Sequence, residues 1–194
     1  MATKIKITDQ KELDEFVKTH LDHRLTALVA PVFDDANAYR PGRGDISKAA
    51  QEGSYVMLRL FIEFLGVKGD RKIKGKLNPT DGDDDDLRLS SFSRWGAANL
   101  DPNDFGPNQS FVADVHRTLC KINAHFTYDV NEARFYDRIA SLPRPDLEKA
   151  MEIIVNKLDE YFYRRVGQDI VVHRDLREQF KKRFTDVKSN VKSN

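Results

Sequence analysis

The sequence predicts an all-α fold: a single-domain bundle of five to six helices with one long acidic loop. Apolar residues recur at every third or fourth position over several stretches, which is the spacing of one face of an α-helix. Capping residues, glycines and prolines bound these stretches, and a length of 194 residues suits one domain. We place the domain at residues 1–187 and a frayed tail at 188–194.

The composition is that of a globular protein held together by its core. Charged residues make up 32% of the chain, but the net charge is only +1, which argues against nucleic-acid affinity over the whole surface. A single cysteine cannot form an intramolecular disulfide and favours a reducing compartment. The N-terminus lacks a long apolar core, and Arg59 and Glu63 break the longest apolar run. We therefore expect a soluble, cytoplasmic protein with no membrane segment.

Start and stop signals divide the chain into helices. Thr8 or Asp9 can cap the first helix, which Pro31 stops. The second helix ends at Gly66, and its last turns, 57–65, are apolar on nearly all sides, which indicates core and not a site. Helices are expected at about 9–31, 47–65, 108–127, 131–140, 146–166 and 172–187.

Residues 66–107 interrupt the helical pattern and form the long acidic loop. Between positions 79 and 104, seven aspartates face two arginines, a balance that is typical of a solvated segment. The run TDGDDDD lacks the ligand order of a calcium loop. Because structureless loops of this length are uncommon, we expect short helical or extended pieces within it. Its second half should be pinned to the body by Leu87, Leu89, Phe92 and Trp95.

The stretch 108–127, NQSFVADVHRTLCKINAHFT, contains the densest set of chemically capable side chains. A helix turns about 100° per residue, so these side chains divide between two flanks. Because the histidines fall on different flanks, we expect no shared metal ion, and we assign neither a metal nor a cofactor to the chain. One flank holds Arg117, Lys121 and His125, and the other holds His116, Cys120 and Asn123.

Cys120 has two interpretations. His116 lies four residues earlier on the same flank, within reach as the base that a cysteine nucleophile needs. A lone cysteine on a helix flank is more often a small buried apolar group. His20 and His23, three residues apart on the first helix, are a further candidate metal pair, but no HExxH or ExxH pattern accompanies them.

The segment HRTLCKINAHFT resembles the histidine-bearing helix of bacterial all-α proteins grouped near the HEPN superfamily, in which an element like Asn123, His125 and Thr127 recurs. The resemblance covers about 20 residues and implies an all-α fold and metal-independent RNA cleavage. Arg117 would then stabilise the phosphate and His125 would act as acid or base. The chain departs from the pattern because seven residues separate these two, more than is usual. Alternatively, His125 and Asn123 satisfy backbone groups at the end of the helix.

The C-terminal part of the chain is basic. From 164 to 194, nine lysines and arginines oppose four acids, and Glu160 and Arg164 are spaced for an ion pair on one helix. The basic residues can bind RNA phosphates, pair with the aspartate run of the same molecule, or form a solvated face. No aromatic residues interleave with them as a stacking surface requires. The face comprises Arg174, Arg177, Lys181, Lys182 and Arg183.

No catalytic motif meets its spacing rule, since the chain has no GxSxG, HExxH, paired-cysteine or dinucleotide-binding pattern. The leading hypothesis is a non-catalytic helical protein that acts through a partner protein or by self-association as a homodimer. The alternative is a HEPN-like, metal-independent ribonuclease of the toxin or phage-defence type that uses Arg117 and His125. In either hypothesis Lys121, Asn123, His116 and Cys120 are candidate binding residues.

Overall fold

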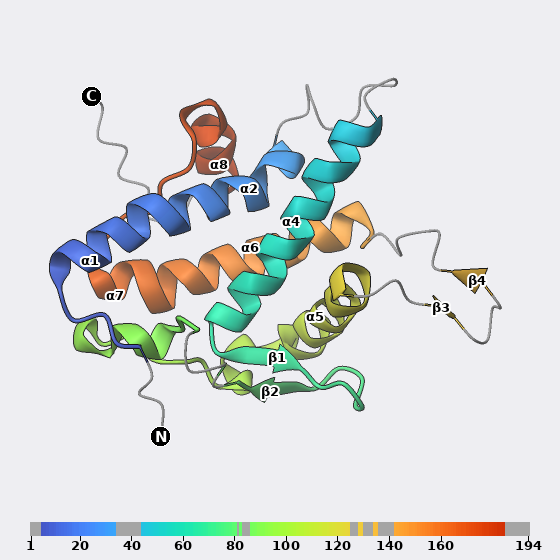
Figure 1. Cartoon of the computed structure of the whole chain (residues 1–194), viewed down its shortest axis with the longest axis horizontal. Coiled ribbons are helices and arrows are strands. Elements are labelled where there is room, and N and C mark those ends of the chain that lie inside the picture. Colours follow the sequence, from blue (N-terminus) through green and yellow to red (C-terminus); the bar gives the residue numbers. More distant parts are fainter. Residues whose placement is uncertain are drawn as a thin grey trace.

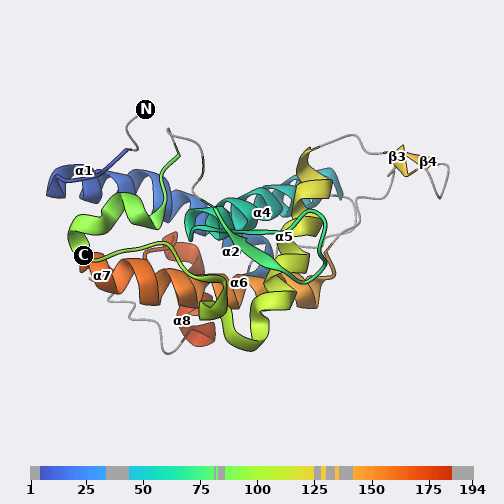
Figure 2. The same cartoon turned by 90° about the horizontal axis from the view of Figure 1, so that it is seen from below.

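The computed structural model describes residues 5–33, 44–80, 82, 86–124, 128–129, 134–135 and 142–184. The chain is mostly helical, and the prediction of an all-α single domain is confirmed. Figure 1 shows a first long rod, α1 to α2, that lies along a second rod, α6 to α7, while α4 crosses between them. Figure 2 shows the same two rods as neighbouring layers, with α5 beside α4.

The first rod contains a π-helical turn between two α-helical segments. It comprises α1 (Gln10–Glu15), η1 (Phe16–Leu21) and α2 (Asp22–Phe33). Asp9 caps it as expected, because its carboxylate accepts the Lys11 amide at 2.6 Å. Pro31 lies within the last turn and does not stop the helix, because the two residues that follow it are buried in the core.

The second rod repeats this design with α6 (Arg144–Leu158), η4 (Asp159–Tyr163) and α7 (Arg164–Val166). Gly167, with φ of +72°, ends it as predicted. The expected Glu160–Arg164 ion pair is wrong. A π-helical turn aligns residues five positions apart, so Arg164 instead pairs with Asp159 at 2.6 Å.

The core is built where these rods meet α4 (Gly44–Phe64) and α5 (Gln109–Ala124). The Ser54 hydroxyl of α4 donates to the Leu28 carbonyl of α2 at 2.8 Å, fully buried. Aromatic rings from four elements pack edge to face or tilted, with centroids 5.0 Å apart for Phe92 and Phe162. The cluster comprises Phe16, Phe64, Phe92 and Phe162.

The segment 66–107 contains short regular elements, as the length of the expected loop indicated. Strands β1 (Val67–Gly69) and β2 (Leu77–Pro79) form an antiparallel hairpin, in which Val67 pairs with Pro79. The 3-10 segments η2 (Leu89–Trp95) and η3 (Pro102–Asn108) follow. Leu89 and Phe92 are fully buried, so the prediction that they pin this segment to the body is confirmed.

Several of the expected helices differ from the structure. Within 131–140, Arg134–Phe135 is strand β4, paired antiparallel with β3 (Tyr128–Asp129), so a helix through these residues is wrong. The last helix, α8 (Arg177–Arg183), is shorter than 172–187 and follows a 3-10 turn, η5 (Arg174–Leu176). The second helix begins at Gly44, earlier than the start expected at residue 47. The tail at 188–194 and much of the aspartate run lie outside the described residues.

Candidate ligand-binding pocket

A pocket of about 340 Å³ opens where the first rod, α4 and the segment before η2 come together. Its size is within the range of small-molecule sites, and its lining combines an apolar wall with a few charged groups. The apolar wall comprises Phe16, Leu21, Leu60, Phe61, Phe64 and Leu87. The polar groups are His20, Arg24, Glu63, Asp86 and Arg88.

The π-helical turn η1 supplies one side of this pocket. Phe16, His20 and Leu21 belong to that turn, and Arg24 follows one turn later on α2. The extra residue in a π-turn changes which side chains share a face, and such turns occur frequently at functional sites. The turn therefore places an aromatic ring, an imidazole and a guanidinium around one opening.

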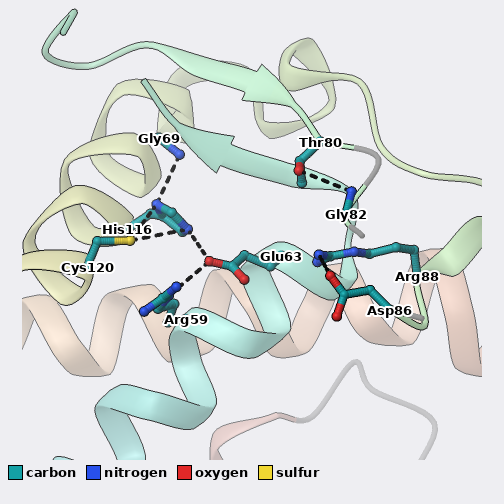
Figure 3. A network of polar contacts seen from close by, with 9 residues as sticks. All are labelled: Arg59, Glu63, Gly69, Thr80, Gly82, Asp86, Arg88, His116 and Cys120. Atoms are coloured by element: carbon teal, nitrogen blue, oxygen red, sulfur yellow. Dashed lines mark hydrogen bonds and ion pairs between the residues drawn. The ribbon is translucent and has the colours of Figure 1, made fainter. Parts of the chain in front are cut away.

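Arg88 is the most unusual group in the pocket, because it is a charged side chain only 7% exposed. Its Nη2 donates to Asp86 at 2.8 Å, while its Nε is buried with no hydrogen-bond partner. Gly82 lies against this guanidinium, and a Cβ added there would come within 2.5 Å of Nε. Figure 3 shows Arg88 extending from the chain toward Glu63. A buried N–H without a partner costs about 1–3 kcal/mol, more when it is charged.

Two donors bind the same carboxylate oxygen of Glu63. Arg59, one turn earlier on α4, donates to Oε1 at 2.9 Å, and His116 Nε2 on α5 lies 3.0 Å from the same atom. Burial raises the pKa of Glu63, but the bonds from His116 and Arg59 outweigh it and lower the pKa to about 2. The carboxylate is therefore ionised, and no described residue hydrogen-bonds its Oε2.

His116 links three elements and is almost fully buried. Its Nδ1 accepts the backbone N–H of Gly69 on β1 at 3.1 Å, so in the neutral ring the proton is on Nε2, which faces Glu63. Burial lowers its pKa, while contacts with Cys120 and Glu63 raise it by more. The Gly69 N–H lowers the pKa of His116, because a second proton on the ring would sit on Nδ1 and face this donor. Figure 3 shows this network at the end of α4.

Glu63, His116 and Cys120 are the one group of three metal-ligating residues found among the described residues, with ligand atoms within 4.8 Å of one another. The geometry does not fit an ion. Cys120 Sγ lies 3.6 Å and 3.8 Å from the two ring nitrogens. A metal at Nε2 would need a proton on Nδ1, where Gly69 already donates. The contacts favour a hydrogen-bond network.

The same contacts bear on Cys120 as a nucleophile. The predicted neighbourhood of His116 and Cys120 is confirmed by their contact on one flank of α5. A base must accept the thiol proton on a free nitrogen, but Nδ1 already accepts from Gly69 and Nε2 faces Glu63. The pair is therefore arranged to position Glu63 and not to activate the sulfur.

The other predicted site residues do not join the pocket. Arg117 is half-buried on α5 and Lys121 is exposed near its end. Asn123 is helical, but its side chain, like His125 and Thr127 as a whole, lies outside the described residues. The pairing of Arg117 with His125 stays a prediction.

The candidate metal pair on the first rod has a different placement from the one expected. His20 and His23 are both exposed, and neither belongs to a group of three metal-ligating residues in the described part of the chain. His20 lies on η1 and lines the pocket, whereas His23 lies on α2 and does not.

Sequence reasoning missed Glu63 and Arg88, and it assigned the end of the second helix to core. Leu60, on that helix, is 42% exposed and lines the pocket. The available signals were weak. Glu63 is the one charge in the run from 60 to 65, and Arg88 stands between two leucines that were expected to be pinned.

Comparisons with known proteins do not extend this description. No family model, no curated protein and no solved structure matches the chain. Among the described residues, no helix is both long and apolar enough to cross a membrane. The site is therefore interpreted from its own chemistry.

Proposed function

We propose that this chain is a non-catalytic binding protein whose ligand is a small amphipathic molecule with an anionic group. The observation that carries the proposal is Arg88, a guanidinium only 7% exposed that lines a 340 Å³ pocket and has Asp86 as its one hydrogen-bond partner among the described residues. A pocket of this size, with an apolar wall and a few charged groups, favours a small ligand over the partner protein or second copy expected from the sequence. The apolar wall would take the hydrophobic part of the ligand.

The energetics of Arg88 support this assignment. Arginine has five donors in a fixed fork that matches a carboxylate or phosphate, and only Asp86 is within hydrogen-bond distance in the described chain. An anionic group in the pocket would add a charge-assisted hydrogen bond to the guanidinium. Arg24 lines the same pocket and adds a second positive charge.

The test compares two probes that differ only in charge, 3-phenylpropionate and 3-phenylpropan-1-ol. Each is titrated into the isotopically labelled protein, and affinities are read from amide shifts of pocket residues such as Leu60 and Leu87. We expect the anion to bind about tenfold more tightly, since a hydrogen bond to a charged group contributes roughly 1.5–3 kcal/mol. In Arg88→Met the two probes should bind equally.

Two variants control for charge and for folding. Arg71→Met removes the same charge from an exposed position outside the pocket and should leave the preference intact. Arg88→Lys keeps a partner for Asp86 but lacks the planar fork of donors, so it should fold and still lose most of the preference. The proposal is wrong if neither probe shifts pocket resonances, or if Arg71→Met and Arg88→Met lose the preference equally.

The ribonuclease alternative predicts catalysis, which the binding proposal does not. It requires RNA cleavage without metal by the purified wild-type chain, abolished by His125→Ala and by Arg117→Ala. Cleavage that persists in His125→Ala would remove the alternative. Cleavage that His125→Ala abolishes would replace the non-catalytic proposal.

A further inference from the structure

We infer that the ligand of this pocket is a small amphipathic zwitterion, in which an ammonium group bound by Glu63 accompanies the anionic group at Arg88, next to an apolar side chain as in a free amino acid. The inference rests on the proposed function and adds the second half of the recognition. Its basis is that Glu63 and Arg88 line the same pocket.

Glu63 is arranged to present one oxygen. Both of its donors, Arg59 and His116, bind Oε1, so Oε2 is left as an acceptor without a donor among the described residues. The side chain is 20% exposed, and Glu63 is one of the residues that line the pocket. His116 is itself fixed by the Gly69 amide, which leaves the carboxylate little freedom to turn away. A fixed, ionised carboxylate oxygen at a pocket wall is the acceptor that an ammonium group needs.

The charges of the wall also match both ends of a zwitterion. Arg24 and Arg88 are balanced there by Glu63 and Asp86. A simple anion would be drawn to the arginines but would also lie near two carboxylates, and a simple cation would have the reverse problem. Figure 3 shows Glu63 on α4 with its carboxylate toward His116 and Arg59, and Arg88 reaching from the segment before η2 toward Glu63. The six apolar wall residues take the side chain of the ligand.

The test uses three probes on the wild-type chain: phenylalanine, 3-phenylpropionate and N-acetylphenylalanine. All three carry the same ring and a carboxylate, but only phenylalanine carries an ammonium group. We expect phenylalanine to bind about tenfold more tightly than the other two, as a charge-assisted contact to a carboxylate implies. In Glu63→Gln, phenylalanine should fall to the affinity of 3-phenylpropionate, whose own affinity should not fall.

Glu52→Gln is the matched control, because it removes the same charge from α4 at a position outside the pocket and should leave the preference unchanged. The comparison of probes in the wild type stands even if Glu63→Gln fails to fold. Equal binding of phenylalanine and 3-phenylpropionate would overturn this inference while leaving the anion-binding proposal in place. Failure of all three probes would overturn both.

Discussion

Asp22 and Tyr163 form a buried pair of polar groups that the fold does not satisfy. Asp22 Oδ1 and the Tyr163 hydroxyl are each buried without a hydrogen-bond partner in the described chain. Burial raises the pKa of Asp22 from 3.8 to about 7. Burial, and then the charge of Asp22, raises the pKa of Tyr163 well above its usual value. The charged form of Asp22 is therefore the form that the folded chain disfavours.

This gives a pH-dependent prediction for Asp22→Asn. Because the pKa is higher in the folded chain, the contribution of Asp22 to stability is fully present below about pH 4 and is lost as the pH rises through 7. We expect the variant to melt about 2–4 °C higher than wild type near pH 8, with no gain near pH 4. Thermal unfolding at the two pH values measures it, and an equal gain at both would contradict the assignment.

For single residues, the sequence predicts contacts within one helix but few contacts between elements. His116 and Cys120 were predictable as neighbours because a helix fixes the positions of residues four apart. Their contact with Glu63 spans 53 positions for His116 and depends on how α4 crosses α5, which no local pattern encodes. The burial of Arg88 likewise depends on how the chain folds over its side chain, which the sequence around it does not predict.

At the scale of elements, Gly69 sets how closely β1 approaches α5. A Cβ added at Gly69 would meet the Ala113 carbonyl oxygen at 2.5 Å, and backbone cannot move aside as a side chain can. We expect Gly69→Ala to lower the free energy of unfolding by about 1–3 kcal/mol through overpacking. It should also weaken the bond from the Gly69 amide to His116. Chemical denaturation measures the first effect, and the His116 ring resonances report the second.

Gly53 on α4 is the matched control. A Cβ there meets nothing within 4 Å, and the residue is helical, so Gly53→Ala should raise the free energy of unfolding by roughly 0.5–1 kcal/mol. A loss of stability in both variants would mean that the close approach of β1 and α5 is not the cause. A gain in both would refute the steric argument for Gly69.

The boundaries of elements were predictable where a cap or glycine marks them, as at Asp9 and Gly167. The π-helical turns were not, because apolar spacing alone does not show an extra residue in a turn. The same turns explain why Arg164 pairs five residues back. One of them also contains His20, which was weighed only as a candidate metal ligand and which lines the pocket.

For the whole molecule, acids of the second rod form ion pairs with part of the basic C-terminal face. Arg183 donates to Glu152 at 2.7 Å and to Glu148 at 3.0 Å. The RNA hypothesis expected a face free to bind phosphates, whereas this arginine belongs to an intramolecular network. Lys182, one position earlier, is exposed. A comparison of Arg183 with Lys182 therefore distinguishes a structural role of this face from a binding role.

We expect Arg183→Glu to lower the free energy of unfolding by about 1 kcal/mol, a small effect because its side chain is 33% exposed. Lys182→Glu should change it by no more than about 0.5 kcal/mol. Denaturation of both variants, with RNA binding measured by filter retention, provides the comparison. If the face binds RNA, both reversals will weaken that binding alike, and an unchanged stability in Arg183→Glu would count against the network.

The single tryptophan lies on the stretch of chain that supplies Arg88. Trp95 is half-buried on η2, its Nε1 donates to Gln10 at 3.3 Å, and the Arg94 guanidinium is 5.9 Å from its ring. Indole emission depends on such polar neighbours, so a movement of η2 against the first rod changes its colour and intensity. The molecule thus has a built-in optical reporter for this contact, which can be followed by fluorescence without a label.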